Sequence, residues 1–407
     1  MAPAGSPESL MAAIRAGADS VYFGVEHLNM RAHAAHARFS IDDLPHIADT
    51  CRAHHVRSYL TLNTVLYDQD TPLMRRIVDA ACQAGIDALI AADVAVMQYA
   101  LTVGLPIHLS TQLNIANFEA LRFYARFADV AVLARELNLE QVRRIHRQII
   151  DESLSGPSGN LLRLEMFVHG ALCMAVSGKC YLSLHAQNRS ANRGDCLQIC
   201  RRGYTVTDRD TGNELLLDGP YIMSPKDLKT IRFLDRMVEA GVTVFKIEGR
   251  ARGPEYVATV TASYRQALDA YRDGLFEQAP FDAWDQRLST VFNRGFWDGY
   301  YLGQPLGEWS QVYGSAASQR KVYLARAIKY FSHLGVAEFE MEADCLHVGD
   351  QVLVTGPTTG AFTQTVPEIR VDLLPVDATR KGERFSLPTS CKIRPSDRLY
   401  KLETLTR

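Results

Sequence analysis

One short phrase recurs in the first 250 residues and constrains the fold more than any other feature of the chain. The phrase is Ala-Gly followed by a short apolar run, at residues 16–23, 84–90 and 240–247. Each copy follows an amphipathic stretch that is typical of a helix. Glycine just beyond a helix can adopt the left-handed conformation that ends it, and the apolar run that follows is typical of a buried strand. The phrase therefore predicts alternating helices and strands.

Further apolar runs extend this series. Together with the repeats they predict eight strands, near 1–4, 20–24, 58–62, 88–91, 106–109, 130–133, 164–168 and 244–248. Eight strand–helix units imply an α/β fold with a parallel sheet closed into a (β/α)8 TIM-type barrel, whose active groups lie at the carboxyl ends of the strands. The alternative is an open doubly wound sheet, but no glycine-rich dinucleotide or Walker loop supports it. Met1 lies almost within the first strand, which raises the expectation that the native chain begins earlier.

The pattern of the sequence changes after residue 280 and again after residue 320. Residues 1–280 are expected to form the barrel, with a cysteine-rich insertion at 170–220, and residues 281–320 are expected to form an aromatic, glycine-punctuated connector. From 321 to 407, short β-like runs without helices predict a small all-β, barrel-like domain. These runs lie at 321–328, 336–341, 351–355, 363–371 and 392–402, with a turn at 356–360.

Half of the eight cysteines are concentrated in 28 residues. They are Cys173, Cys180, Cys196 and Cys200, with the spacing C-x6-C-x15-C-x3-C. The others, Cys51, Cys82, Cys345 and Cys391, lie singly and far apart. Four thiolates gathered by one segment can enclose a tetrahedral metal ion or an iron-sulfur cube, which a chain of this size does not need in order to fold. The group of four therefore indicates a functional site.

The four cysteines could also form disulfides or bind structural zinc. No signal-peptide pattern precedes the fold, and no run approaches the roughly 18 apolar residues of a membrane span. We therefore expect a reduced, cytoplasmic setting with no membrane partner, which disfavours disulfides. Zinc sites built from four cysteines usually use two short C-x2-4-C knuckles, and only Cys196 and Cys200 approach that spacing.

The charge of the chain limits how it could bind nucleic acid. A net charge of −2 argues against a protein coated in basic surface, because phosphate binding depends on Lys and Arg. One local patch is an exception, because the segment from residue 179 to residue 204 contains five cations and a single acid, Asp195. These cations are Lys179, Arg189, Arg193, Arg201 and Arg202. Any nucleic-acid contact is therefore expected close to the cysteines.

Polar residues follow several of the expected strands. They are Asn63, Ser110, Gln112, Asn114, His169, Lys246, Glu248 and Arg250. In a barrel these side chains would converge on one mouth, together with the cysteine insertion that follows His169. The alternatives are local, because an Asn or Ser after a strand is commonly a turn or helix cap, and Glu248 with Arg250 could be a plain ion pair.

Several segments together resemble a known family. They are residues 2–6, 17–19, 61–64, 110–112, 165–204, 246–250 and 254–257, and the most specific is the His-Gly-Ala-x-Cys to Cys-Arg segment within 165–204. They resemble the collagenase-like peptidase family U32. This resemblance covers the expected barrel and supports it.

The resemblance implies two kinds of chemistry. Some members of the family are assigned as peptidases, whereas others are oxygen-independent hydroxylation proteins that hold a 4Fe-4S cluster. Those modify the wobble uridine of tRNA, a cytidine of 23S ribosomal RNA, or a ubiquinone precursor, with prephenate implicated as hydroxyl donor. The sequence has neither a His-Glu-x-x-His zinc helix nor a Gly-x-Ser-x-Gly elbow. We therefore expect Cys173, Cys180, Cys196 and Cys200 to bind a 4Fe-4S cluster, with zinc as the alternative.

The same resemblance assigns roles to the polar residues. Prephenate has two carboxylates, and Arg193, Arg201 or Arg250 could each grip a carboxylate in a bidentate manner. His169 could relay a proton or fix the cluster loop by a hydrogen bond. The expected catalytic residues are His169, Glu248 and Arg250, and the expected substrate-binding residues are Asn63, Ser110, Gln112, Asn114, Arg193, Arg201 and Lys246.

Three functions remain open at this point. Among the hydroxylation proteins that the chain resembles, the appended β domain and the single complete set of four cysteines are similar to the RNA-modifying members, and the length is similar to those that act on tRNA. The resemblance therefore favours a tRNA hydroxylase that takes its hydroxyl from a small dicarboxylate. The second hypothesis is a collagenase-like peptidase of the U32 type. The third is a non-catalytic metal-binding scaffold for RNA or partner proteins.

Overall fold

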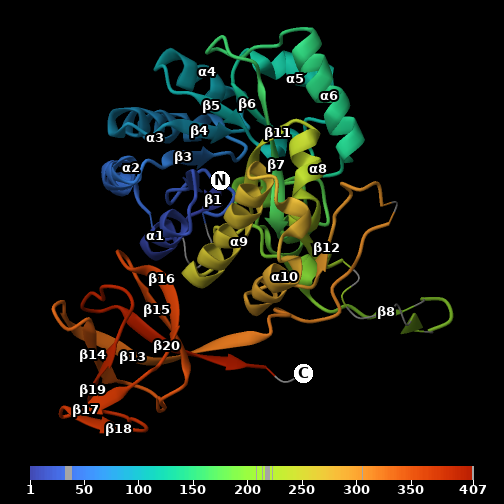
Figure 1. The fold of residues 1–407 in the computed structure, drawn as a ribbon. Helices are drawn as coiled ribbons and strands as arrows, with labels where there is room; N and C mark the ends of the chain where they lie inside the picture. Colours follow the sequence, from blue (N-terminus) through green and yellow to red (C-terminus); the bar gives the residue numbers. More distant parts are fainter. Residues whose placement is uncertain are drawn as a thin grey trace.

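The computed structural model describes residues 1–407 except 33–38, 208, 213, 216–220, 222, 305 and 406–407. The described chain contains a ten-stranded sheet, a separate eight-stranded sheet and one small pair of strands. Figure 1 shows the first sheet surrounded by helices and the second sheet at one side, next to α1 and α9. An α/β fold with a parallel sheet and a separate antiparallel sheet is thus confirmed.

All eight strands expected in the first part of the chain are present. They are β1 (Ala2–Pro3), β2 (Ser20–Phe23), β3 (Arg57–Leu62), β4 (Ala88–Ala91), β5 (Ile107–Leu109), β6 (Val130–Val132), β7 (Arg163–Gly170) and β11 (Val242–Ile247). The first seven pair in parallel in the order of the sequence, and β11 pairs in parallel with β7. Their buried positions form short, nearly continuous apolar runs, as expected for parallel strands that are covered on both faces.

Helices alternate with these strands. They are α1 (Pro7–Arg15), α2 (Leu44–Ala53), α3 (Thr71–Ala84), α4 (Val94–Thr102), α5 (Phe118–Ala125), α6 (Leu139–Asp151), α8 (Leu234–Glu239) and α9 (Pro254–Arg272). Gly85 ends α3 in the left-handed conformation, with a φ of 77°, which is the role that the recurring phrase predicts. None of the helices in the described part of the chain combines the length and the apolar composition needed to cross a membrane.

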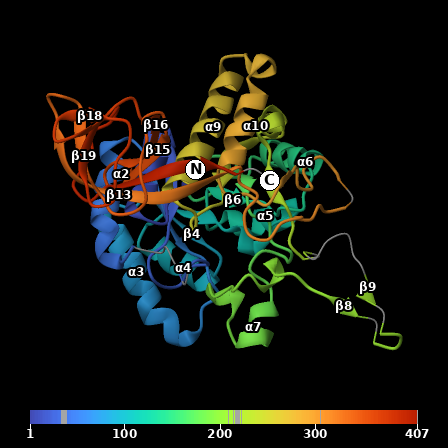
Figure 2. The same cartoon turned by 90° about the horizontal axis from the view of Figure 1, so that it is seen from below.

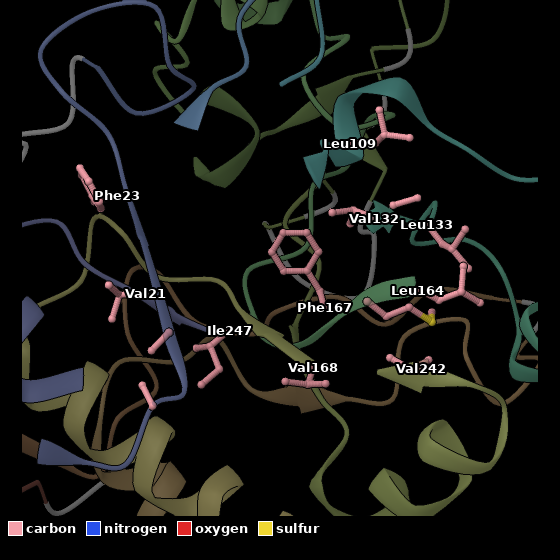
Figure 3. Close-up of a cluster of buried hydrophobic side chains, with 14 of the residues drawn as sticks. Val21, Phe23, Leu109, Val132, Leu133, Leu164, Phe167, Val168, Val242 and Ile247 are labelled. Atoms are coloured by element: carbon pink, nitrogen blue, oxygen red, sulfur yellow. The ribbon is translucent and has the colours of Figure 1, made fainter. Parts of the chain in front are cut away.

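The main core lies between the parallel strands and the helices that cover them, since it includes buried residues such as Ile47 of α2, Ile77 of α3 and Val260 of α9. Figure 3 shows Val21 from β2, Leu109 from β5, Val132 from β6, Leu164 from β7 and Ile247 from β11 in one cluster. All five side chains belong to a single buried cluster. Strands that are far apart in the sequence are therefore joined by one hydrophobic core, which contributes most of the stability of this part.

The sequence did not predict three elements of this part of the chain, of which two are strands that extend the first sheet and one is a helix. The strands β10 (Asp227–Lys229) and β12 (Phe296–Trp297) pair with each other, and β10 runs antiparallel to the end of β7. The helix α10 (Phe281–Thr290) contacts α9. Residues 281–301, expected as a connector, thus carry α10 and β12, and several of their apolar side chains, among them Trp284, Leu288 and Trp297, are buried in the main core. The two strands span only two and three residues, too few for an alternation of side chains to be recognised.

The cysteine-rich insertion has little regular structure. It contains the short helix α7 (Leu182–Gln187) and the paired strands β8 (Val206–Thr207) and β9 (Glu214–Leu215). Figure 2 shows β8 and β9 projecting away from the rest of the chain, and α7 at the lower edge of the molecule in that view.

The C-terminal sheet is antiparallel in all its described pairings. Its strands are β13 (Gln319–Phe331), β14 (Val336–Met341), β15 (Gln351–Gly356), β16 (Gly360–Thr365), β17 (Ile369–Val371), β18 (Leu374–Val376), β19 (Arg384–Pro388) and β20 (Arg398–Thr404). The turn expected at 356–360 joins β15 to β16. The run expected at 363–371 is divided into two strands, with Pro367 between them. The run expected at 392–402 begins only at Arg398, after Pro395, because proline lacks the N–H that a ladder needs.

The turn between β15 and β16 docks the C-terminal sheet against the first helix. Arg15 donates a hydrogen bond to the Thr358 carbonyl at 3.1 Å, and Lys321 pairs with Glu255 of α9 at 2.8 Å. Gly360 lies so close to α1 that a Cβ there would stand 2.9 Å from the Ala12 nitrogen. The close approach of the two parts therefore depends on a residue without a side chain.

Gly360→Ala is expected to lower the free energy of unfolding of the chain. The loss should exceed the cost of placing a side chain on a residue with left-handed backbone conformation, because the added Cβ would also collide with α1. Gly360 has a φ of +72°, whereas Gly335 in the same part of the chain has a φ of +66° and open space within 4 Å of where a Cβ would stand. Gly335→Ala is therefore the matched control for left-handed strain. Thermal and urea unfolding should show an extra loss of about 1–3 kcal/mol in the Gly360 variant, the usual cost of overpacking. Equal losses would mean that the contact with α1 contributes nothing.

Candidate functional site

One cavity of about 190 Å³ brings together most of the residues that the sequence singled out. Its walls include Cys173, Cys180, Cys196, Cys200, Asn63, Ser110, Gln112, Arg201, Lys246, Glu248 and Arg250. These residues come from segments that are far apart in the sequence. The cavity is therefore the candidate functional site.

The carboxyl ends of the parallel strands position the polar part of this site. Asn63 follows β3, and Ser110 and Gln112 follow β5. The Asn63 amide donates hydrogen bonds of 3.1 Å to both the Ser110 hydroxyl and the Gln112 carbonyl oxygen. These three side chains form a network across two neighbouring loops, which holds them in fixed orientations.

The cysteines reach the cavity from the insertion after β7. All four are free thiols, and none is fully buried. Burial raises the pKa of the Cys200 thiol, Arg201 lowers it, and the other three cysteines raise it further. The other three cysteines therefore lie near enough to Cys200 to affect the charge of its thiol. Within the described residues, no group of three or more His, Cys, Asp or Glu side chains was found that could hold a metal ion.

Lys246 is held in the cavity wall by a buried carboxylate. Its ammonium lies 2.7 Å from Glu165 of β7, and His108 of β5 lies 3.2 Å from the other oxygen of the same carboxylate. Burial alone would raise the pKa of Glu165, but the charge of Lys246 and the hydrogen bond from His108 bring it down to about 2. Glu165 is therefore ionised at neutral pH, and it fixes the position of Lys246.

Glu248 and Arg31 form a second ion pair at the same mouth. The Arg31 guanidinium lies 2.8 Å from the Glu248 carboxylate. Burial would raise the pKa of Glu248, but the charge of Arg31, with smaller effects from other arginines, lowers it to about 2. Glu248 is therefore a carboxylate at neutral pH and not a proton donor.

Arg250 differs from these cations because its partners are neutral. It donates hydrogen bonds to the Asn29 side-chain oxygen at 3.0 Å and to the Thr61 hydroxyl at 2.6 Å. No described carboxylate forms an ion pair with it, and burial lowers its pKa to about 10. Arg201 likewise donates to neutral oxygens, those of Ser224 and Pro225. Both guanidiniums remain charged at pH 7 and can still take an anionic partner.

The whole cavity is strongly cationic. The cations in its described lining are Arg31, Arg135, Arg201, Lys246, Arg250 and Arg252, and the one carboxylate there is Glu248. Opposite charges in a partly enclosed cavity interact more strongly than they do in water. The site is therefore suited to an anionic ligand.

Three of the expected site residues lie outside this cavity. His169 is buried behind it, between the rings of Tyr256, Tyr264 and Phe296. Arg193 forms an ion pair with Asp70 and donates to the Val65 carbonyl at 2.8 Å. Asn114 lines a second cavity, which adjoins the first. These placements separate His169 and Arg193 from the other expected residues, whereas Asn114 shares the second cavity with Cys173.

Sequence reasoning missed three cations of the site. Arg31 follows β2, Arg135 follows β6, and Arg252 follows β11. The same rule that found Asn63 and Ser110, a polar residue shortly after a strand, could have found them. No distinctive motif marks these strand ends, so the three cations do not stand out in the sequence.

Comparison with known proteins places the chain in a family. The sequence model of peptidase family U32 matches residues 5–311, which include the parallel sheet and the cysteine insertion. The chain belongs to peptidase family U32. The family resemblance found in the sequence is thereby confirmed.

Relatives within this U32 group carry two kinds of name. The chain is 62% identical to a protein named collagenase from Porphyromonas gingivalis, over 99% of this chain and 97% of the relative. It is 30% identical to tRNA hydroxylation protein P1 of Bacillus subtilis, over 91% of this chain and 86% of the relative. It is 38% identical to the 23S rRNA 5-hydroxycytidine C2501 synthase of Escherichia coli, over 66% of this chain and 39% of the relative.

The buried histidine of this site should make stability depend on pH. Burial lowers the pKa of His169 to about 3, from an ordinary value of 6.5. Below pH 6.5 the unfolded chain binds a proton that the folded chain excludes, so stability should fall as the pH falls. The expected share of His169 is about 2 kcal/mol between pH 7 and pH 5.

Urea unfolding at several pH values measures this effect. His169→Gln should flatten the dependence of the free energy of unfolding on pH over this range, whatever its effect at pH 7. His54→Gln, at an exposed histidine, is the control. An unchanged slope in the His169 variant would show that the buried ring does take up a proton in the folded state.

Proposed function

We propose that this protein is an iron-sulfur-dependent, oxygen-independent RNA hydroxylase. Its proposed reaction is 5-hydroxylation of the wobble uridine of tRNA, with prephenate as the hydroxyl donor. The observation that carries the proposal is the gathering of four free thiols and six cations around one cavity. The names of two relatives, a tRNA hydroxylation protein and an rRNA hydroxycytidine synthase, support the same class of reaction.

The donor set fits a 4Fe-4S cluster in the type and number of its ligands, although among the described residues no group of side chains was found that could hold a single metal ion. Cys173, Cys180, Cys196 and Cys200 would bind the cluster, because four thiolates are its usual ligands and all four residues line one cavity. Arg201 lies near these thiols and would offset the negative charge that a thiolate-bound cluster carries. When bound, the cluster supplies electron transfer, which amino-acid side chains do not supply themselves.

The residues around the cluster ligands suit a dicarboxylate donor. Arg250 and Arg201 are fixed by neutral oxygens, so their charge is available to carboxylates. Lys246 adds a cation whose position is set by Glu165. Replacing a C5 hydrogen of uridine by hydroxyl oxidises the base by two electrons, and the donor that gives up the hydroxyl oxygen is reduced by the same number. Binding and orientation of the donor are the proposed tasks of these three cations.

We also propose that the eight parallel strands close into a (β/α)8 barrel. The Ile247 amide of β11 donates to the Met1 carbonyl at 3.1 Å, and the Tyr22 hydroxyl of β2 donates to the Ile247 carbonyl at 2.8 Å. These bonds connect the last parallel strand to the first two. A barrel would place all the strand ends that carry site residues around one mouth.

Exposed groups on the insertion support contact with RNA. Lys179 and Arg202 are exposed, and Tyr181 keeps 60% of its surface accessible. Accessible Lys and Arg side chains bind phosphates, and an exposed aromatic ring can stack on an unpaired base. Tyr204 is less available, because its hydroxyl donates to the Ile199 carbonyl at 2.8 Å.

A peptidase is the second candidate because of the 62% identity to a protein named collagenase. The described lining residues of the candidate site and of the adjoining cavity include serines and cysteines but no histidine. A nucleophilic Ser or Cys is usually activated by a neighbouring base, most often His. The arrangement of these side chains therefore favours redox chemistry over peptide hydrolysis.

The cluster ligands can be tested one by one. Alanine at Cys173, Cys180, Cys196 or Cys200 should remove most of the bound iron and sulfide, because each thiolate would hold one corner of the cluster. Alanine at Cys82 or Cys391, which lie outside the cavity, should leave iron unchanged. The measurement is iron and acid-labile sulfide after anaerobic purification. Undiminished iron in a variant of the four would remove that residue from the ligand set, and zinc in place of iron would reject the cluster.

The reaction can be tested on the nucleosides of whole cells. A strain without the protein should lack a 5-hydroxylated uridine in its tRNA, and the wild-type gene should restore it while Cys196→Ala should not. Mass spectrometry of tRNA nucleosides gives this readout, and a gelatin-cleavage assay on the same purified proteins provides the comparison. An unchanged nucleoside profile, with gelatin cleavage that survives the Cys196 change, would favour the peptidase.

A further inference from the structure

A second cavity of about 220 Å³ adjoins the cysteine site. The two cavities share wall residues, among them Thr111, Arg135, Leu172 and Cys173. Another part of the wall of the second cavity comes from residues 297–309, in the segment that the sequence suggested was only a connector. Cys173, an expected cluster ligand, therefore stands between two compartments.

Three aromatic rings form one side of this second cavity. Trp297 is buried, and its ring meets Tyr300 edge to face, with centroids 5.2 Å apart. A Cβ placed on Gly307 would lie 3.4 Å from the Tyr300 hydroxyl, 3.7 Å from the Trp297 ring and 3.8 Å from the Trp309 ring. The rings of Trp297, Tyr300 and Trp309 therefore converge on one point. Tyr300 and Trp309 each keep 37% of their surface exposed, so part of each side chain remains accessible to a ligand.

The aromatic wall is tied to the cysteine insertion. Trp309 forms an antiparallel bridge with Pro225, and the Ser310 amide donates to the Ser224 carbonyl at 2.7 Å. Arg201, beside the cluster ligand Cys200, donates to the Ser224 hydroxyl and to the Pro225 carbonyl. A short chain of hydrogen bonds thus fixes the position of Trp309 relative to the cysteines.

Polar groups line the second cavity together with the rings. They are Asn114, Glu136 and Arg135. The buried Nε of Arg135 has no hydrogen-bond partner among the described residues. The side chain of Asn114 carries an amide, which offers both a donor and an acceptor, and the polar edge of a pyrimidine base requires both.

We propose that this second cavity binds the target base of the RNA, a uracil turned out of its stack, with its ring against Trp309 and Tyr300 and its polar edge toward Asn114. The inference rests on the proposed RNA hydroxylase function and adds the subsite for the base. An enzyme that acts on a base must take the base out of the stack, and it commonly holds the base between aromatic side chains. The shared wall at Cys173 would place the base beside the cluster site, while the cationic cavity holds the donor.

The test measures base stacking separately from turnover. The ligands are an unmodified tRNA anticodon stem-loop and the same stem-loop with an abasic site at the wobble position. The chain has three tryptophans, and Trp284 and Trp297 are buried. The emission of Trp309 in the anaerobically purified holoprotein should therefore be quenched by the uridine stem-loop and much less by the abasic one. The Trp309→Phe variant should still bind the uridine stem-loop, but the difference in quenching between the uridine and the abasic stem-loops should disappear.

Turnover should respond to the same position. Trp309→Ala should raise the KM for the stem-loop about tenfold, since stacking contributes roughly this much per base, and should change kcat less. Gly307→Leu, which adds a side chain among the three rings and removes none of them, should have a similar effect. Tyr313→Ala, at an exposed ring of the same segment outside the cavity lining, is the control and should leave KM unchanged.

The possible outcomes separate the two proposals. Hydroxylation by the wild type, with equal quenching by both stem-loops and an unchanged KM in the Trp309 and Gly307 variants, would overturn the base subsite and leave the hydroxylase function standing. A wild type that neither binds nor hydroxylates the stem-loop would overturn both. Quenching of Trp309 by a gelatin peptide in place of the stem-loop would overturn the base subsite in favour of a peptide subsite.

Discussion

A buried ion pair connects the strands beneath the cavity. The positions of the site residues at the ends of these strands depend on it. Glu165 of β7 is fully buried between Lys246 of β11 and His108 of β5. Removing such charges from water costs several kcal/mol per ion, and this cost is offset only while the partners remain in contact. A displacement of one strand relative to the others would leave a buried charge unpaired. The ends of β5, β7 and β11, from which the site residues extend, are therefore held in one arrangement.

The cations of the cavity fall into two groups, those that pair with a carboxylate and those that are held by neutral oxygens. Lys246 and Arg31 have carboxylate partners, so much of their charge is already balanced within the protein. Arg250 and Arg201 are oriented by neutral oxygens, which fix the guanidinium without satisfying its charge. A buried cation of this kind gains most from an incoming anion. The names given to relatives of this family differ, and the charge arrangement of the site is an independent guide to its chemistry.

The sequence predicted the parts of this structure that follow from local rules. The eight parallel strands were found because apolar runs and glycine-terminated helices are visible over short windows. Asn63 and Ser110 were found because they directly follow strands. The role of Glu165 could not be predicted, since its partners Lys246 and His108 are distant in the sequence and meet it only across the folded sheet. The position of Trp309 was missed for the same reason, because a long-range bridge to Pro225 sets it.

The end of β7 has a consequence for how the insertion is built. Gly170, the last residue of β7, is paired with Leu228 of β10, so the polypeptide that leaves the sheet returns to the same place. Closing a long loop costs conformational entropy. Here the pairing of the short strand β10 with the end of β7 stabilises the closure. The thiols are therefore not needed to bring the ends of this loop together. The insertion can therefore present its thiols beside the end of β7, while the order of the parallel strands is set by their own pairing.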